Sequence, residues 1–178
     1  RRNVLDEIHR ACKDIGFMSV VGHGVSQDLI HQMEKTSRQF FKLPKHVKMS
    51  MAPKKWNPEN SNVYRGYFPA TVFGKEGLDM SDLTRTTQTD PDCHLTEINK
   101  FPEEFSQAQR DVFSDYFREI HKLGVKLMKA IFEIFKADSS TASSILRNVT
   151  SRHIVDTNLT SVNIGVMKFE GGRNAEET

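Results

Sequence analysis

The stretch ACKDIGFMSVVGHGVSQDLI, residues 11–30, sets the order of the first elements of the fold. Its apolar, partly β-branched run at residues 17–21 predicts a short buried strand. Residues 22–24 place a histidine between two glycines and predict a turn, because glycine adopts backbone angles that other residues resist. Ser26 is a good N-cap, so we expect a helix directly after the turn.

The turn histidine, His23, is open to three interpretations: a metal ligand, a catalytic base or part of the bend. Non-haem iron sites use two histidines and a carboxylate, commonly with His-x-Asp or His-x-Glu on one strand. None of the seven histidines has an acid two residues later, although His94 and His153 have one three residues later. The chain also lacks a zinc motif, a nucleophile elbow and a phosphate loop. The residues alone therefore predict no catalytic residue and no metal ligand in this chain.

Two helices are expected on either side of the first strand. Residues 4–15 carry apolar side chains at helical spacing, with Asn3 as N-cap and Gly16 as the stop. The second helix follows Ser26 and ends near Pro44. Its predicted inner face consists of Ile30, Met33, Ser37, Phe40 and Phe41.

The centre of the chain is expected to be irregular. Residues 42–62 predict a loop or irregular helix, and YRGYF at 64–68 leads into a loop-like stretch to about residue 100. The lysines of residues 42–56 have two interpretations: a solvated connection, or a basic surface whose affinity for nucleic acid falls steeply with salt. The lysines concerned are Lys42, Lys45, Lys48, Lys54 and Lys55.

A long helix is expected to begin at FPEEF, residues 101–105, where Pro102 and two acids suit a first turn. Two apolar stripes run along it, which predicts a helix buried on more than half its girth, roughly 50 Å long. We expect a bend at Gly124 and a short helix capped by Ser140. Alternating apolar residues then predict a strand over residues 161–169.

Composition and charge narrow the class of protein. A net charge of +2 and a pI near 8.5 give no argument for nucleic acid, and the apolar runs are too short for a membrane span. No secretory leader opens the chain, and its two cysteines form no paired motif, which predicts reduced thiols and a cytoplasmic protein. Both ends look cut, so we expect a fragment of a longer protein.

Five short motifs occur in an order that resembles the isopenicillin N synthase-like group of iron- and 2-oxoglutarate-dependent oxygenases. They are residues 11–16, the turn at 22–24, FFKLPKHVK at 40–48, YRGY at 64–67 and the long helix from residue 101. The resemblance implies an α+β fold: the helix-rich N-terminal region of a jelly-roll (double-stranded β-helix) oxygenase, with a long backing helix and the first strands of an incomplete barrel. It also implies a non-haem dioxygenase N-terminal domain at 1–100, then the start of the jelly-roll domain at 101–178, truncated before the metal motif.

What the resemblance implies for function concerns the parent protein. The parent would be a non-haem Fe(II), 2-oxoglutarate-dependent oxygenase or oxidase that uses O₂ on a small organic substrate. This chain would bind neither cofactor alone and would pack on the remaining C-terminal half. It would support the barrel and line the pocket with Tyr64, Tyr67, Phe68 and Ser161, and His23 would be structural.

One departure from the family pattern keeps a second interpretation open. The last strand has Met167 or Phe169 where family members often carry a tyrosine that contacts the co-substrate. The alternative is therefore a non-catalytic family member that acts as a ligand- or protein-binding module. In either case, an incomplete barrel predicts that residues 1–178 alone self-associate through an exposed helix stripe. That stripe is expected to contain Phe113, Phe117, Met128, Phe132 and Phe135, or else the parallel set of isoleucines and leucines on the same helix.

Overall fold

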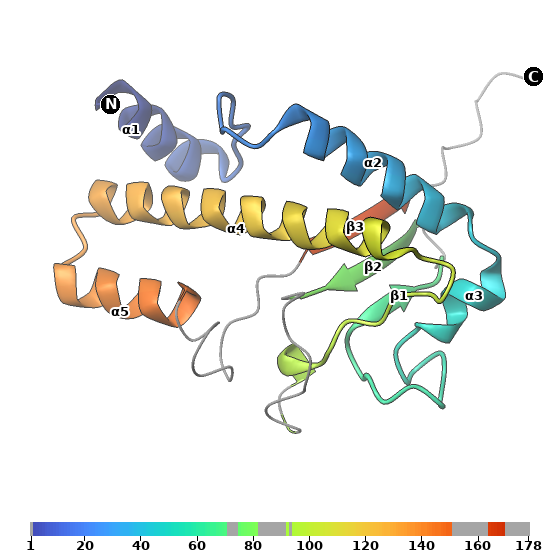
Figure 1. The fold of residues 1–178 in the computed structure, drawn as a ribbon. Coiled ribbons are helices and arrows are strands. Elements are labelled where there is room, and N and C mark those ends of the chain that lie inside the picture. The colour runs from blue at the N-terminus through green and yellow to red at the C-terminus, as the bar shows by residue number, and fades with distance from the viewer. Residues whose placement is uncertain (1, 71–74, 82–91, 93, 151–163, 170–178) are drawn as a thin grey trace, which may run out of the picture.

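The computed structural model of the chain describes residues 2–70, 75–81, 92, 94–150 and 164–169. The elements in order are the helix α1 (Arg2–Arg10), the π-helical turn η1 (Ala11–Ile15), the helices α2 (Gln27–Lys42) and α3 (Lys45–Ser50), the strands β1 (Gly66–Phe68) and β2 (Lys75–Met80), the 3₁₀ turn η2 (His94–Thr96), the helices α4 (Gln107–Ile134) and α5 (Ser139–Thr150), and the strand β3 (Ile164–Phe169) (Figure 1).

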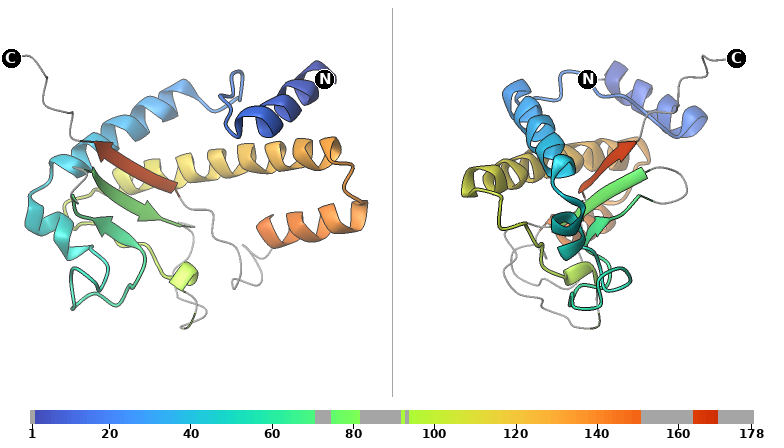
Figure 2. Two further views of the ribbon diagram at one scale, coloured as in Figure 1. Left: turned by 180° about the vertical axis from the view of Figure 1, so that it is seen from behind. Right: turned by 90° about the vertical axis from the view of Figure 1, so that its right-hand side faces the viewer.

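The three strands form an antiparallel sheet in the order β1-β2-β3. Tyr67 of β1 lies opposite Leu78 of β2, and Phe68 lies opposite Gly77. Because successive side chains of a strand point to opposite faces, Tyr67 and Leu78 share one face of the sheet and Phe68 lies on the other. In the left view of Figure 2 the sheet lies in front of α4, which passes behind it.

The hydrophobic core joins the Tyr67 face of the sheet to α2, to α4 and to the segment that precedes α4. Its buried members are Met33, Phe40, Phe41, Met51, Ala52, Tyr67, Leu78, Met80, Phe105 and Phe113. The Phe40 ring packs edge-on against the rings of Phe41, Tyr67 and Phe105, in the T-shaped geometry that aromatic pairs favour. This cluster fixes the sheet against the helices.

The predicted inner face of α2 is confirmed in its second half. Met33, Ser37, Phe40 and Phe41 are buried, and the Ser26 side chain accepts a hydrogen bond from the Leu29 N–H, as an N-cap does. The helix ends at Lys42, and the sequence then forms α3, a regular helix in the stretch expected to be a loop or irregular helix.

The long helix α4 begins later than its sequence predicts. Ser106 caps it, with Gln109 completing a capping box, whereas Pro102 lies in the turn before it. The prediction rested on Pro102 and the two acids that follow it, which form a turn ahead of the cap instead of the first helical turn. Phe101 and Phe105 pack on the core from this turn. The 28 residues of α4 continue through Gly124 as one helix, about 42 Å long at the usual rise per residue.

Two strand predictions were wrong. Residues 17–21 form no strand, and the side chains of Phe17 and Val21 are 83% and 89% exposed, because none of the described strands lies beside this run. Conversely, β2 forms in the stretch after residue 68 that was expected to be loop-like, and β1 forms within YRGYF, for which no element was predicted. The sequence of β2 gave no strand signal because it contains Gly77 and two acids, and these residue types are depleted in strands.

The predicted caps also need correction. Helix α1 begins at Arg2, before the expected cap Asn3. Asp138 rather than Ser140 caps α5: its carboxylate accepts hydrogen bonds from the N–H groups of Ser140 and Thr141, and side-chain hydrogen bonding from these residues holds its pKa below the usual range.

The apolar stripe expected to be exposed on α4 is only partly so. Phe113 and Phe117 are buried, Met128 and Phe132 are half-buried, and Phe135 is exposed. Within the described ranges, no helix is both long enough and apolar enough to cross a membrane.

Candidate functional site

The YRGY segment can enter β1 only because a glycine stands at position 66. Gly66 has a φ of +130°, and a Cβ built there would collide with the Met51 carbonyl oxygen. That same oxygen accepts a hydrogen bond of 3.1 Å from the Tyr67 N–H. The backbone of β1 is therefore pressed against the end of α3, and no larger residue fits.

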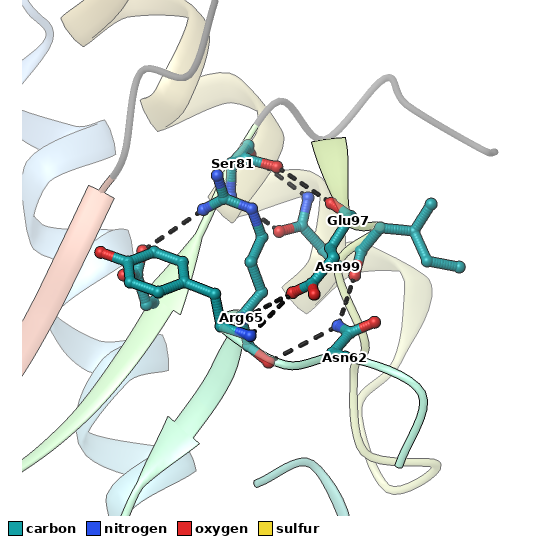
Figure 3. Close-up of polar contacts among 8 residues, drawn as sticks. Asn62, Arg65, Ser81, Glu97 and Asn99 are labelled. Carbon is teal, nitrogen blue, oxygen red and sulfur yellow. Dashed lines mark hydrogen bonds and ion pairs between the residues drawn. The ribbon is translucent and has the colours of Figure 1, made fainter. Parts of the chain in front are cut away.

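The turn before Gly66 closes around a single buried carboxylate (Figure 3). Glu97, 1% exposed, accepts hydrogen bonds from three consecutive backbone N–H groups: Val63 at 2.7 Å, Tyr64 at 3.0 Å and Arg65 at 2.9 Å. The half-exposed His94 ring also lies 3.3 Å from this carboxylate. A carboxylate with this many donors is satisfied in its buried position, so it fixes the conformation of the turn.

Asparagines tie this turn and the end of β2 to neighbouring segments. Asn62 donates to the Ile98 carbonyl at 2.9 Å. Asn99 accepts from the Ser81 N–H at 2.8 Å and returns a hydrogen bond to the Ser81 carbonyl at 3.2 Å (Figure 3). Ser81 and Asn99, which flank residues 82–98 in the sequence, are thus joined to each other by two hydrogen bonds.

The Tyr64 ring stands at the open side of this cluster. It is 41% exposed and packs edge-on against the Phe68 ring, 6.4 Å between centroids. The Arg65 guanidinium lies 5.8 Å from the Tyr64 ring centroid. An exposed aromatic ring is therefore held on several sides.

Arg65 and Asp79 form an ion pair beneath that ring. The Arg65 side chain is fully buried and its guanidinium lies 3.5 Å from the Asp79 carboxylate. Burial raises the pKa of Asp79, while the neighbouring Arg65 charge opposes that rise. This ion pair, whose two charges compensate each other, lies beneath the contacting rings of Tyr64 and Phe68, which we call the Tyr64–Phe68 corner.

Tyr67 points the other way, into the core, where it joins a second buried ion pair. Its hydroxyl donates to Glu76 at 2.6 Å, and Lys48 lies 2.7 Å from the same Glu76 oxygen. Lys48 also donates to the Phe41 carbonyl at 3.0 Å. Burial and the Glu76 carboxylate raise the pKa of Tyr67 above its usual value. Lys48 is therefore buried, which contradicts the interpretation of all five lysines as a solvated or nucleic-acid-binding surface.

The structure brings only part of the predicted pocket wall together. Tyr64 and Phe68 are in contact and at least partly accessible, whereas Tyr67 is 3% exposed on the opposite face of the sheet. Ser161 lies outside the described residues. Substrate contact by these four residues stays a prediction.

Sequence reasoning missed the acids that organise the site. Glu97, Asp79 and Glu76 carry no motif, and the only signal was the position of Glu97 three residues after His94. Their partners lie far along the chain: Glu97 reaches back 34 residues to Val63, and Glu76 reaches back 28 residues to Lys48. Such pairings follow from the tertiary fold and leave no local pattern in a single sequence.

His23 is part of the bend, as the resemblance implied. Its Nδ1 accepts a hydrogen bond of 3.1 Å from the Val25 N–H, and Gly22 and Gly24 have φ values of +63° and +81°. The described residues contain no group of three or more His, Cys, Asp or Glu side chains able to hold a metal ion. An iron site of the facial-triad type is therefore not formed by this part of the chain.

The model of the N-terminal region of the non-haem dioxygenases, described as "non-haem dioxygenase in morphine synthesis N-terminal", matches residues 1–104. The chain belongs to this family. Jasmonate-induced oxygenase 3 of Arabidopsis thaliana is 34% identical over 128 residues, covering 71% of this chain and 33% of the relative. Flavanone 3-dioxygenase 3 of Oryza sativa subsp. japonica is 28% identical over 133 residues, covering 75% of this chain and 37% of the relative.

The chain thus spans little more than a third of the length of these relatives. Among solved structures, JOX2 in complex with 2OG, Fe and JA matches with a TM-score of 0.66 at 20% identity, over 94% of this chain and 44% of that one. The 2-oxoglutarate complex of AtDAO1 from Arabidopsis thaliana matches with a TM-score of 0.57 at 22% identity, over 78% and 48%. The fold of this chain is that of part of these oxygenases.

Proposed function

We propose that this chain is the N-terminal part of a non-haem Fe(II) and 2-oxoglutarate-dependent oxygenase that acts on a small organic molecule. The observation that carries the proposal is the family match over residues 1–104, which contain the whole Tyr64–Phe68 corner. Within the parent, residues 1–100 form the dioxygenase N-terminal domain and residues 101–178 begin the jelly-roll domain.

In this proposal the chain contributes one wall of the substrate pocket. Tyr64 and Phe68 contact the substrate directly, and Tyr67 supports the wall from the core. Ser161 keeps the substrate-binding role that the resemblance implies. The exposed edge of Tyr64 and the half-buried Phe68 ring offer an apolar corner with one hydroxyl, which suits a small organic molecule.

Iron and 2-oxoglutarate are proposed to bind to residues of the parent other than those described here. Iron supplies the Lewis acid and redox centre of such an enzyme. The role of this chain is to shape the pocket and keep water from it. The 2OG and Fe in the JOX2 structure, and the 2-oxoglutarate in the AtDAO1 structure, support this cofactor assignment by analogy.

The remaining C-terminal half of the parent is the proposed partner of the exposed apolar run at residues 17–21. Phe17 and Val21 are the most exposed large apolar side chains among those described, and Ile15 beside them is also exposed. An exposed apolar segment of this kind suits burial against another part of the protein.

The test is turnover by the full-length parent, supplied with Fe(II), 2-oxoglutarate and O₂. The candidate substrates follow the names of the relatives and the titles of the solved neighbours: JA, a flavanone, homoarginine, auxin and thymine. We expect iron-dependent formation of succinate that at least one of these compounds, or a close analogue, stimulates. A parent that consumes no 2-oxoglutarate with iron present would contradict the proposal.

A non-catalytic binding module is the second candidate, because Met167 and Phe169 occupy the strand position where the family often has a tyrosine. Iron titration of the folded parent separates the two. An enzyme binds one equivalent of Fe(II), whereas a parent that keeps the fold and binds none is a module.

A further inference from the structure

We propose that Glu97 is a positioning residue that presents Tyr64 to the substrate in one fixed orientation. The proposal rests on the function proposed above, in which Tyr64 and Phe68 form the pocket wall. It assigns substrate specificity to a carboxylate that the substrate does not touch.

The first step is the backbone of the turn. Glu97 Oε1 accepts from the Val63 N–H. Its Oε2 accepts from the N–H groups of Tyr64 and Arg65 (Figure 3). Both carboxylate oxygens are needed, and both are buried. The three donors fix the direction in which the Tyr64 side chain leaves the backbone.

The second step is the side chain. The Tyr64 ring packs against the Phe68 ring and lies beside the Arg65 guanidinium. Arg65 is itself placed by the same carboxylate, because its N–H is one of the three that Glu97 accepts. Glu97 therefore determines both the backbone under Tyr64 and one of the groups that pack on its ring.

The third step is the contrast between this support and the exposure of the ring. Tyr64 is 41% exposed although Glu97 holds its backbone and Phe68 and Arg65 pack on its ring. An ordinary surface tyrosine gains nothing from such support, whereas a recognition surface gains affinity and selectivity by being rigid before the ligand arrives. The arrangement is typical of a preorganised binding surface.

The fourth step gives the test substitution. In Glu97→Gln, one oxygen becomes an NH₂ group, which faces an N–H donor in either orientation of the amide. At least one of the three hydrogen bonds is lost and a donor is left buried without an acceptor. The side chain keeps its size, so the packing of the core around it is retained.

Glu76→Gln is the matched control. Glu76 is also a buried glutamate, 5% exposed, and accepts from Lys48 and Tyr67 on the core face of the sheet. Its substitution leaves Lys48 without a carboxylate and lowers global stability, but the N–H groups of residues 63–65 keep their acceptor. A general loss of stability would therefore raise amide exchange in both variants, whereas a specific effect on the turn would appear only in Glu97→Gln.

The experiment compares the two variants in the full-length parent. Amide hydrogen exchange is followed at Val63, Tyr64 and Arg65 and, as a reference, at Phe113 in the buried part of α4. We expect Glu97→Gln to raise exchange at the three turn amides at least tenfold relative to Phe113. Glu76→Gln should change all four amides by a similar factor.

Steady-state kinetics with the five compounds named above supply the functional readout. We expect Glu97→Gln to raise KM for the best compound about tenfold and to reduce its preference over the others, with KM for 2-oxoglutarate unchanged. Unaltered exchange at residues 63–65 would overturn the proposal, as would equal changes in both KM values. If the parent turns over none of the compounds, the exchange result alone decides the positioning role, and the failure belongs to the proposed function.

Discussion

Gly66 is the residue whose replacement the fold tolerates least. It combines a positive φ with a backbone oxygen at the place where a Cβ would stand. We expect Gly66→Ala to destabilise the chain by at least about 3 kcal/mol, because either β1 or the end of α3 must move. The measurement is urea unfolding followed by circular dichroism.

Gly124 provides the opposite case. It lies inside α4, and a Cβ there would meet no atom within 4 Å. Gly124→Ala should raise the free energy of unfolding by about 0.5–1 kcal/mol through helix propensity. A loss of stability at this site would show that α4 needs the flexibility of glycine in its centre.

Tyr67 makes the stability depend on pH in the alkaline range. Burial and the Glu76 carboxylate raise its pKa in the folded chain above the ordinary value of 10.0. The folded state therefore keeps the phenol proton longer than the unfolded state does. This contribution is complete below about pH 10 and is lost as the pH rises from there towards the folded pKa.

The check is thermal unfolding of the chain and of Tyr67→Phe between about pH 8 and pH 11, a range that brackets the ordinary pKa of tyrosine. We expect the wild-type melting temperature to fall more steeply above about pH 10, while the two curves run parallel below it. Curves that stay parallel over the whole range would mean that Tyr67 ionises as readily in the folded chain as in the unfolded one.

At the scale of elements, the ion pair between Lys48 and Glu76 connects α3 to β2, and through Phe41 and Tyr67 it reaches α2 and β1. Removing one partner leaves a charge in the core. We expect Lys48→Met to cost about 3–5 kcal/mol, and the double variant Lys48→Met/Glu76→Gln to recover part of that loss. A double-mutant cycle of unfolding free energies measures the coupling.

The exposed pair Glu34–Arg38 on α2 is the control for that cycle, since both side chains are largely in solvent. Arg38→Met should leave the unfolding free energy unchanged within error, because exposed pairs contribute little. If Arg38→Met and Lys48→Met lowered the unfolding free energy equally, burial of the Lys48–Glu76 pair could not be the cause of the loss.

The elements that could be predicted from sequence are those with a local signal. The Ser26 cap, the inner face of α2 and the glycine turn around His23 depend on neighbours in the chain, and they were correct. The strand β2 and the start of α4 depend on distant partners: Glu76 is placed by Lys48, and Phe105 by the core. The acids of the candidate site were missed for the same reason, since Glu97 acts on a turn more than 30 residues earlier.

The exposed apolar surface is a property of the whole molecule. Phe17, Val21, Ile15 and Phe135 are exposed. We expect the 178-residue chain alone to self-associate. Phe17→Ser/Val21→Ser should reduce this association without lowering the unfolding free energy, because neither side chain packs on the core. Sedimentation velocity over a concentration series measures the association.

Lys13→Ser is a control for the surface change, because it alters an exposed polar residue of the same region. Its association should equal that of the unaltered chain. If the double variant associates as strongly as the unaltered chain, the surface that drives association lies elsewhere. Phe135, at the end of α4, would then be the next residue to replace.

The reciprocal hydrogen bonds between Ser81 and Asn99 have a consequence for how the sheet depends on the chain between them. They close the chain on itself at the base of residues 82–98, next to the end of β2. The entropy of closing a loop grows only with the logarithm of its length, so residues added between Ser81 and η2 cost the sheet little. The two hydrogen bonds thus hold the end of β2 beside Asn99 whatever the length of chain that separates Ser81 from Asn99.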